Sequence, residues 1–462
     1  MLQCFSPDRS HVIRILPVTA ATMPAWLERN SYARAWLSSV GFHAEPGTFA
    51  FVPHGESRPF VVAAPIEGAP VYAFSGLPTT LPEGTYALDL EQRDGSPTDA
   101  AIGWALGSYA FSTYKKTHRV AAQLAWPDNA DRAEVERIVR AVFLARDMIN
   151  TPAQDMGPAQ LADAARAVAE AHGAALRVIV GDELLAQNYP TVHAVGRASD
   201  RPPRLIDLRW GDDAAPKVTL VGKGVCFDTG GLDLKSREGM LEMKKDMGGA
   251  AIVLALADAL MAARTPIRLR VLIPAVENSV SGNAVRPRDI VRTRSGKTVE
   301  IGNTDAEGRL ILCDALAEAD SERPDLLVDC ATLTGAARVA LGPELQALYC
   351  DDEATAAGLL ESGAATDDPL WRMPLWRPYR RDLESKCADL SNVAKNSFAG
   401  SIIAALYLAE FVSTPRWAHI DLYAANPSSR PGRPEGGEAT GLRALYAYIR
   451  GQYARREAPA RR

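Results

Sequence analysis

The chain has 462 residues, of which 47% are hydrophobic and 23% charged, with 51 Lys+Arg against 56 Asp+Glu and a formal net charge of -5. These proportions are those of a folded globular protein, and they exclude a disordered chain, which needs fewer apolar residues and more like charges to resist collapse. The slight acid excess argues against a dedicated nucleic-acid binder, whose basic face must neutralise phosphates, and the length allows two or three domains.

Cysteine usage and targeting signals bear on where the chain works. The 6 cysteines include no CxxC pair, and several lie inside apolar runs, where a free thiol packs as a small hydrophobe. This pattern favours a reducing compartment over a disulfide framework. The N-terminus lacks the basic start and apolar core of a signal peptide, and the longest apolar run, residues 248–263, is too short to cross a bilayer. A cytoplasmic protein without a membrane segment is therefore expected.

The chain up to about residue 126 has the pattern of a small domain. Turn signals rich in proline and glycine separate short apolar segments, such as residues 49–52 and 59–64. This alternation is typical of a small α/β domain with short strands.

A helix is expected to follow this first region. After a break at residues 127–129, apolar residues recur at helical spacing over residues 131–150, and Asp131 and Glu134 form a plausible capping pair. These features predict an N-terminal α/β domain over residues 1–128 and a larger domain over residues 129–462, with residues 129–150 as a connecting helix.

The remaining chain alternates between helical and strand patterns. Helices are expected over residues 161–172, 249–263, 307–318 and 401–412, and strands over residues 204–209, 217–222, 267–275, 326–332 and 417–422. Alternation of this kind predicts a mixed β-sheet covered by helices on both faces. The fold class is thus α/β with two domains, the second of them larger.

Four carboxylates mark the region that concentrates chemistry. Asp228 lies in the glycine-rich segment 221–235, Asp246 at the start of an apolar helix, and Asp305 and Glu307 just before another helix. Ligand sites in α/β sheets lie at such strand ends and helix starts, and buried carboxylates are costly unless paired or bound to a metal. The cluster suggests a divalent metal site, although spacing by itself leaves helix caps or a solvated face as the more frequent explanation.

Histidine and phosphate-binding motifs are missing from the same region. There is no HExxH, which excludes the usual histidine-rich mononuclear zinc hydrolases. No GxxxxGK[ST] is present, so the glycine-rich segment gives little support to a phosphate cradle. Taken without further information, Lys223 and Lys235 are more often salt-bridge partners than catalysts, and Arg309 is usually a solvated or ion-paired residue.

A series of motifs favours a functional interpretation of these charged residues over a structural one. Residues 303–310, Asn-Thr-Asp-Ala-Glu-Gly-Arg-Leu, match the signature of the leucyl aminopeptidase family of two-metal exopeptidases. Further segments resemble that family in the same order, namely residues 221–224, 227–231, 243–250, 331–335, 371–375 and 417–421. The resemblance covers roughly residues 140–450, whereas the N-terminal domain resembles the family only faintly, chiefly at residues 103–109, and looks short for it.

The resemblance implies a centre with two divalent metal ions. One ion would be held by Lys223, Asp228, Asp246 and Glu307, and the other by Asp228, Asp305 and Glu307, so that Asp228 and Glu307 bridge the pair around a water molecule or hydroxide. Oxygen ligands suit Zn²⁺, Mn²⁺ or Mg²⁺, so the identity of the metal is not fixed by them. Lys223 can ligate only when neutral, so its pKa must fall from about 10.4, which burial and neighbouring cations can achieve.

The same resemblance gives roles to two other cations. Lys235 would polarise the scissile carbonyl and stabilise its oxyanion, and Arg309 would hold a bicarbonate ion that acts as general base. Stabilisation of charge that develops only in the transition state lowers the barrier to attack by the bridging water. The planar guanidinium group matches an oxyanion such as bicarbonate.

The resemblance also implies a pocket for the substrate side chain. It would be built from Met243, Thr332 and Ala439, with backbone contacts at Leu333 and Gly335. Met243 and Thr332 are more often core residues, but their places in the matched motifs favour the pocket. Ala439 is small where some relatives carry methionine, so bulkier residues could be accepted.

The expected protein is a metallo-aminopeptidase that removes N-terminal residues, apolar ones such as leucine in particular, from short peptides. The free α-amine would bind the metals, which excludes internal peptide bonds. The family resemblance further implies a homohexamer with central catalytic domains. Two alternatives remain: a catalytically silent relative acting as a binding or scaffold protein, against which the intact ligand set speaks, and a two-metal phosphoesterase, in which a ligating lysine is unusual.

Overall fold

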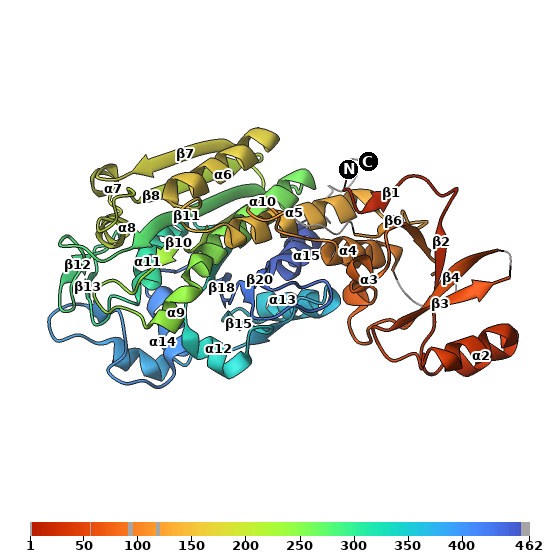
Figure 1. Ribbon diagram of the computed structural model, residues 1–462. Coiled ribbons are helices and arrows are strands. Elements are labelled where there is room, and N and C mark those ends of the chain that lie inside the picture. The colour runs from red at the N-terminus through yellow and green to blue at the C-terminus, as the bar shows by residue number, and fades with distance from the viewer. Residues whose placement is uncertain (1, 56, 91–95, 117–120, 454–462) are drawn as a thin grey trace. The chain divides into compact units, whose positions relative to one another are not determined.

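The computed structural model describes residues 2–55, 57–90, 96–116 and 121–453. The chain forms two compact units, Met1–Phe143 with Ser428–Glu435, and Leu144–Pro427 with Gly436–Arg462. Each unit has its own sheet and helices (Figure 1), so the predicted two-domain α/β class is confirmed. The boundary after residue 128 stays a prediction, since helix α5 (Arg132–Asn150) contributes residues to both units.

The N-terminal unit is built on a six-stranded sheet. Its strand order is β1-β6-β5-β2-β4-β3, and the described strands are β1 (Phe5–Ser6), β2 (Ile13–Pro17), β3 (Phe49–His54), β4 (Ser57–Ala63), β5 (Thr85–Leu88) and β6 (Gln123–Ala125). Only β3 and β4 pair antiparallel among these strands. The helices are α1 (Met23–Arg29), α2 (Ser31–Ser39), α3 (Leu77–Thr80) and α4 (Pro97–Gly107). Trp26, Leu37 and Val62 belong to its apolar core.

The larger unit contains a mixed nine-stranded sheet. Its order is β16-β15-β18-β14-β9-β11-β8-β7, with β10 paired to β11. The strands are β7 (Ala175–Val180), β8 (Arg204–Trp210), β9 (Lys217–Gly222), β10 (Gly224–Asp228), β11 (Arg268–Asn278), β14 (Leu326–Ala331), β15 (Gln346–Tyr349), β16 (Leu370–Arg372) and β18 (Trp417–Asp421). The central pairs, β18-β14, β14-β9 and β9-β11, are parallel, whereas β15-β18, β11-β8 and β8-β7 are antiparallel.

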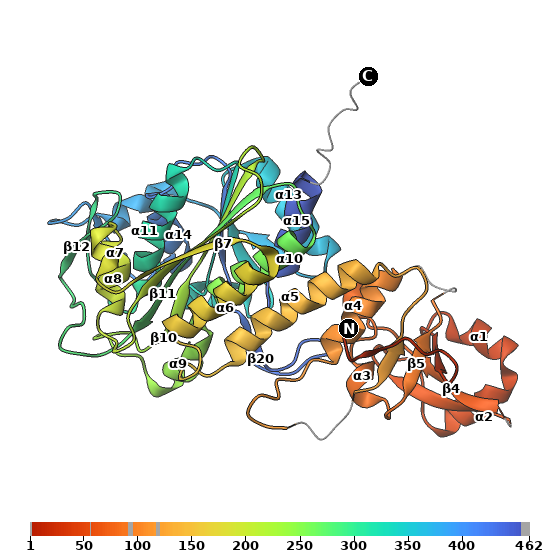
Figure 2. The ribbon, with the colours of Figure 1, turned by 90° about the horizontal axis from the view of Figure 1, so that it is seen from above.

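Helices cover both faces of this sheet (Figure 2). One face carries α6 (Pro158–His172), α10 (Gly248–Ala262), α13 (Glu353–Ala365) and α15 (Leu442–Tyr453), and the other carries α7 (Glu183–Ala186), α8 (Pro190–Gly196), α11 (Glu307–Ser321) and α14 (Gly400–Ala409). Shorter elements are α9 (Arg237–Leu241), α12 (Gly335–Leu341), β12 (Ile290–Arg292), β13 (Thr298–Glu300), β17 (Leu390–Ser391), β19 (Ala425–Asn426) and β20 (Gly436–Gly437). The predicted mixed sheet with helices on both faces is confirmed.

Helix α10 is the central buried helix of the larger unit. Its residues are apolar almost all round, as expected of a helix enclosed by other elements, and Gly248 to Met261 are all buried. Gly249 allows the close packing, because a Cβ atom there would lie 2.1 Å from the carbonyl oxygen of Cys330 in β14. The helix that follows Asp246 is thereby held directly against the sheet.

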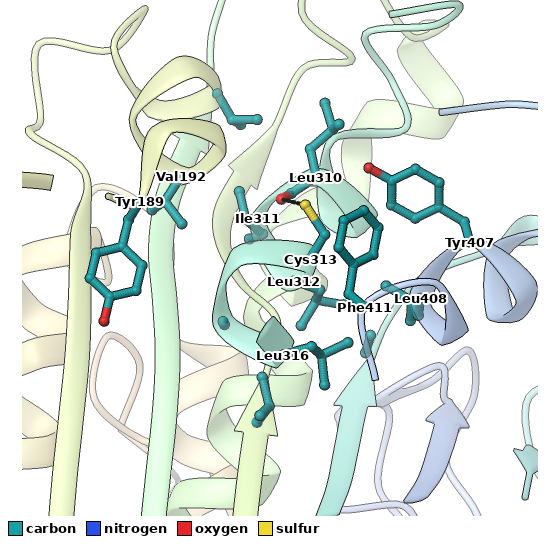
Figure 3. Packing of buried hydrophobic residues seen from close by; sticks show 14 of the residues in the cluster. Tyr189, Val192, Leu310, Ile311, Leu312, Cys313, Leu316, Tyr407, Leu408 and Phe411 are labelled. Carbon is teal, nitrogen blue, oxygen red and sulfur yellow. Dashed lines mark hydrogen bonds between the residues drawn. The ribbon is translucent and has the colours of Figure 1, made fainter. Parts of the chain in front are cut away.

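Helix α11 is buried against α14 on the other face. Figure 3 shows Leu310, Ile311 and Leu316 of α11 within the apolar cluster that also includes Tyr407 and Phe411. The rings of Tyr407 and Phe411 are 5.3 Å apart. Burial of this cluster fixes the start of α11, and with it Glu307.

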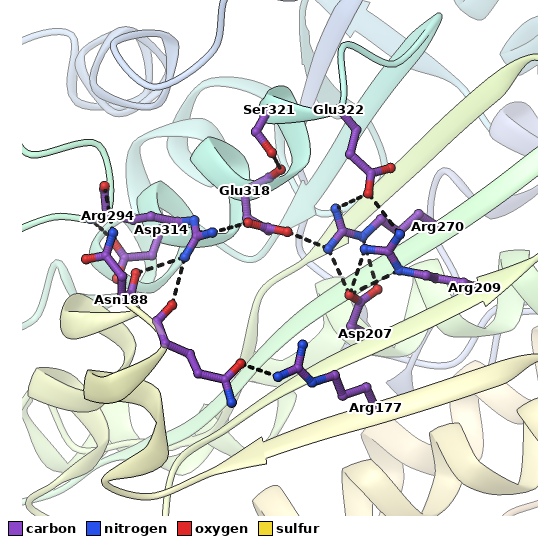
Figure 4. Close-up of polar contacts among 11 residues, drawn as sticks. Arg177, Asn188, Asp207, Arg209, Arg270, Arg294, Asp314, Glu318, Ser321 and Glu322 are labelled. Carbon is purple, nitrogen blue, oxygen red and sulfur yellow. Dashed lines mark hydrogen bonds and ion pairs between the residues drawn. The ribbon is translucent and has the colours of Figure 1, made fainter.

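An ionic network ties α11 to strands β8 and β11 (Figure 4). Arg270, whose side chain is 5% exposed, lies 2.8 Å from Asp207, 2.7 Å from Glu318 and 3.1 Å from Glu322. Arg209 also pairs with Asp207 and with Glu322. A buried guanidinium group thus has a carboxylate for most of its donors, which offsets the cost of removing it from water.

The sequence predicts free cysteines rather than disulfides, and no apolar run long enough to span a membrane. All six cysteines lie in the described residues and are free; Cys387 is exposed and the others are buried. Among the described residues, no helix is long and apolar enough to cross a bilayer.

Candidate active site

The four predicted carboxylates come from elements around the parallel centre of the large sheet. Asp228 ends β10, and Asp246 lies in a short 3-10 helix, Met243–Met247, that leads into α10. Asp305 lies in the loop before α11, and Glu307 is the first residue of that helix. Strand ends and helix starts meet here, which is the usual location of ligand sites in such sheets.

Three of these carboxylates form a tight group. Oxygens of Asp228, Asp305 and Glu307 all lie within 4.8 Å of one another. Asp246 is joined to the group by Lys223, whose Nζ is 2.8 Å from Asp246 Oδ2 and 3.0 Å from Glu307 Oε1. Lys223 also donates a hydrogen bond of 2.8 Å to the carbonyl oxygen of Thr332.

The second predicted lysine lies on the other side of the group. Lys235 Nζ is 2.8 Å from Asp228 Oδ2 and 2.5 Å from Asp305 Oδ1. Asn278, at the end of β11, donates a hydrogen bond of 2.8 Å to Asp228 Oδ1 and so fixes the orientation of that carboxylate. The Asp228 side chain is therefore held from two directions.

Without bound cations, the lysines of this site do not supply enough positive charge to balance its carboxylates. Burial, aided by the negative charge of Asp228, raises the pKa of Glu307 to about 8 and that of Asp305 to about 6. Burial opposes the charge of Lys223, but the carboxylates of Asp246 and Glu307 outweigh it and raise the Lys223 pKa. Burial by itself therefore does not yield the neutral lysine that ligation requires; cations among the carboxylates are needed.

The chemistry of the donor set fits divalent cations. Glu307 is buried, and its Oε2 accepts no hydrogen bond within the described residues. An ionised oxygen without a partner is expensive to bury, whereas a hard divalent ion satisfies it. The three grouped carboxylates, with Asp246 nearby, are likewise stabilised by such ions, which makes this cluster a suitable metal centre.

A cavity of about 520 Å³ opens onto the cluster. Most of the predicted site residues line it: Lys223, Asp228, Lys235, Met243, Asp246, Asp305, Glu307, Thr332, Leu333 and Gly335. Arg309 and Ala439 are buried and are not among the lining residues. Arg309 donates a hydrogen bond of 2.7 Å to the carbonyl oxygen of Asn392, and burial lowers its pKa.

Known proteins share both the sequence and the fold. Residues 143–446 match the catalytic domain of the cytosol aminopeptidase family, and residues 13–127 match the M17 aminopeptidase N-terminal domain. The chain belongs to the M17 cytosol aminopeptidase family. It is accordingly a hydrolase of the leucyl aminopeptidase type.

Relatives of this M17 aminopeptidase match most of its length. A probable cytosol aminopeptidase of Geobacter sp. (strain M21) is 42% identical over 366 residues, which cover 76% of this chain and 74% of the relative. The crystal structure of the cytosol aminopeptidase from Coxiella burnetii has a TM-score of 0.94 at 46% identity and covers 97% of this chain and 99% of its own. The bottromycin maturation enzyme BotP in complex with Mn has a TM-score of 0.85 at 33% identity, covering 95% and 99%.

Sequence reasoning missed several residues that shape the aminopeptidase site. Asn278 lies three residues beyond the predicted end of its strand, and a polar side chain at a strand terminus was the available signal. Asp421 Oδ1 accepts hydrogen bonds of 3.2 Å from the backbone N–H groups of Leu333 and Thr334, and thereby positions the loop after β14. Lys245 and Tyr423 also line the cavity, although neither was assigned a role.

Proposed function

We propose that this M17 aminopeptidase removes N-terminal residues, including apolar ones such as leucine, from short peptides with the help of two divalent metal ions. The observation that carries the proposal is the group formed by Asp228, Asp305 and Glu307, whose oxygens lie within 4.8 Å of one another in the family's catalytic domain. A single carboxylate would suit many roles, but a group this close requires cationic partners.

The metal ligands are proposed as follows. Lys223, Asp228, Asp246 and Glu307 hold one ion, and Asp228, Asp305 and Glu307 hold the other, with Zn²⁺, Mn²⁺ or Mg²⁺ as the candidates. When bound, the two ions acidify a water molecule for attack, polarise the scissile carbonyl and accept the free α-amine of the substrate. The last contact accounts for exopeptidase activity, since an internal peptide bond offers no amine.

Two cations of the chain contribute directly to the proposed reaction. Lys235 lines the cavity and pairs with Asp228 and Asp305. Once metal ions neutralise these carboxylates, its ammonium group would be free to stabilise negative charge on the substrate carbonyl oxygen. The buried guanidinium group of Arg309 has an Nε without a hydrogen-bond partner in the described residues, which suits it to hold bicarbonate as the general base.

The substrate side chain is proposed to lie beside the metal ligands. Met243 and Thr332 line the same cavity as the carboxylates, as do Leu333 and Gly335, which offer backbone groups. Thr332 Oγ1 donates a hydrogen bond of 2.7 Å to Asp246 Oδ1, so the pocket wall is tied to the metal site. The family resemblance also assigns the small residue Ala439 to this pocket, although its side chain is buried and does not line the cavity.

The assembly and location of the enzyme are part of the proposal. We infer a cytoplasmic homohexamer with a domain boundary after residue 128. Among the described residues of the larger unit, Trp371, Trp376 and Phe398 are exposed apolar side chains, which an interface between subunits would cover. Light scattering coupled to size-exclusion chromatography should give about six times the chain mass of 49.7 kDa, and a monomeric mass would contradict the hexamer.

A metal-dependence assay tests the central claim. The protein is stripped with a chelator, and hydrolysis of Leu-p-nitroanilide is followed after addition of Zn²⁺, Mn²⁺ or Mg²⁺. Turnover should vanish on stripping and return with at least one metal. A stripped protein that retains full activity would exclude the metal mechanism. A protein that hydrolyses no N-terminal residue with any metal would instead be the catalytically silent relative, and a phosphatase substrate screen would detect phosphoesterase activity.

A further inference from the structure

We propose that Lys245 recognises a carboxylate on the substrate, so that this aminopeptidase also accepts peptides that begin with aspartate or glutamate. The inference rests on the proposed function, because it concerns the specificity of the same cavity. Lys245 lies in the 3-10 helix Met243–Met247, next to the proposed metal ligand Asp246. The neighbouring residue Lys244 provides an internal comparison.

Lys245 is a buried cation that pairs with no carboxylate of the residues that the structure describes. It is 8% exposed, and its side chain lines the cavity. Within the described part of the chain its ammonium group makes no hydrogen bond or ion pair, and its contact is with the ring of Tyr423, whose centroid is 5.1 Å from Nζ. Removal of an ammonium group from water is costly unless a counter-charge is supplied. A substrate carboxylate in the cavity would supply it.

The neighbouring residue Lys244 is bound by the protein itself and does not face the cavity. Its Nζ donates a hydrogen bond of 2.8 Å to the carbonyl oxygen of Asn150, and Lys244 does not line the cavity. Two adjacent lysines therefore differ sharply: one has a protein partner, and the other faces the substrate space. The difference is geometric, since both side chains carry the same charge.

The other charged residues around the cavity leave the wall near Lys245 positively charged. Arg338 lies 5.7 Å from the centroid of the same Tyr423 ring and adds a second positive charge, although Asp421 is 4.0 Å from its guanidinium group. Glu238 and Glu242 line the cavity too, but both are exposed, so water screens their charge. The buried end of this wall is therefore positive.

The position of Lys245 indicates which substrate carboxylate it meets. Met243, proposed to contact the N-terminal side chain, lies two residues away on the same segment, and both residues line the cavity. The N-terminal amine is directed to the metal ligands, so the side chain of that first residue is the group closest to Met243. An acidic first side chain would therefore reach the ammonium group of Lys245.

The test compares two substrates in three forms of the metal-loaded enzyme. The values of kcat/KM are measured for Glu-p-nitroanilide and Leu-p-nitroanilide with wild type, Lys245→Met and Lys245→Arg. Lys245→Met should lower the glutamyl-to-leucyl ratio about 10- to 100-fold, the usual worth of a hydrogen bond to a charged group, and Lys245→Arg should keep most of it. Lys244→Met is the matched control and should leave the ratio unchanged.

A measurement on wild type guards against a misfolded variant. Free glutamate should inhibit the wild-type enzyme competitively at a concentration comparable to that of free leucine. Equal losses for both substrates in Lys245→Met would show a structural role and overturn the inference, as would a wild type that cleaves Leu-p-nitroanilide but not the glutamyl substrate. In those cases the proposed function stands. Failure of wild type on both substrates would count against the proposed function itself.

Discussion

Gly308 and Lys223 are in such close contact that no side chain fits between them. A Cβ atom on Gly308 would lie 2.6 Å from Cε of Lys223 and 2.7 Å from its Nζ. Gly308 lies in helix α11, directly after Glu307, so glycine is needed here for close approach rather than for its backbone freedom. The contact brings the lysine within reach of both Asp246 and Glu307.

The first prediction follows from this contact. Gly308→Ala should reduce metal content and activity together, because the new methyl group displaces the amine of Lys223 from its place. Stability should change little, since alanine favours a helix over glycine by about 1 kcal/mol and so offsets part of the strain. Metal analysis, Leu-p-nitroanilide turnover and thermal unfolding measure the three effects. Gly451→Ala in α15 is the control and should remain active, because no atom of the described residues lies within 4 Å of the new Cβ.

Glu307 is predicted to be indispensable. Glu307→Gln removes the charge of a side chain proposed to bridge both metals, so metal occupancy should fall and activity should drop by more than about 100-fold, beyond the loss typical of an outer-shell change. Metal content by mass spectrometry and kcat are the measurements. Glu361→Gln, an exposed change in α13, should resemble wild type. Full turnover by Glu307→Gln would refute the proposed metal centre.

Arg270 is predicted to stabilise the larger unit. Arg270→Met removes the cation that Asp207, Glu318 and Glu322 share. Because these carboxylates keep other arginine partners, the cost should be about 3 kcal/mol, at the lower end of the range for a broken buried ion pair. Urea unfolding should show this loss. The exposed Arg286, paired with Asp289, provides a comparison, and Arg286→Met should cost less than about 1 kcal/mol. Similar losses in both variants would argue against a special role for the network.

Asp314 is predicted to make the free energy of unfolding depend on pH. Burial raises its pKa from 3.8 to about 6, even though it accepts hydrogen bonds from the backbone N–H groups of Thr191 and Arg294. Because the folded-state pKa is the higher one, the contribution of Asp314 to stability falls as pH rises from 4 to 6, by up to about 3 kcal/mol. Unfolding midpoints of wild type and Asp314→Asn, compared at several pH values, should converge or cross in that window. A difference independent of pH would contradict the prediction.

The hydrolysis rate should rise from neutral to alkaline pH. The substrate's α-amine, with an ordinary pKa of about 7.7–8.0, must be neutral to bind a metal ion. Initial rates at subsaturating Leu-p-nitroanilide between pH 6 and pH 9 would show the rise. A maximum near pH 5 would be incompatible with binding of the substrate through its free amine.

The spacing of apolar residues predicted those helices and strands whose conformation depends mainly on their own sequence. The helix expected over residues 131–150 is α5, and Asp131 accepts the expected capping hydrogen bond from the Glu134 N–H at 3.0 Å. The sequence does not predict β10, because a glycine-rich segment is typical of a loop. The segment is a strand since it pairs in parallel with β11, and that partner lies far along the chain.

The site residues also fall into two groups, those that sequence motifs predict and those that only tertiary contacts place in the site. Asp228, Asp305 and Glu307 lie in motifs, so the sequence predicts them and the fold brings them together. Lys245 has a side chain that usually faces solvent, and nothing local indicates its burial. Its surroundings depend on Tyr423, which follows β18. Tertiary contacts of this kind leave no pattern along the chain.

The unequal exposure of the thiols has a practical consequence. The thiolate is the reactive form, and burial raises the pKa of Cys226, Cys313 and Cys330. Cys387 is exposed and all the other cysteines are buried. The folded wild-type chain therefore carries its own attachment point: a maleimide dye should couple once per subunit, so single-molecule fluorescence can follow assembly without any engineered residue.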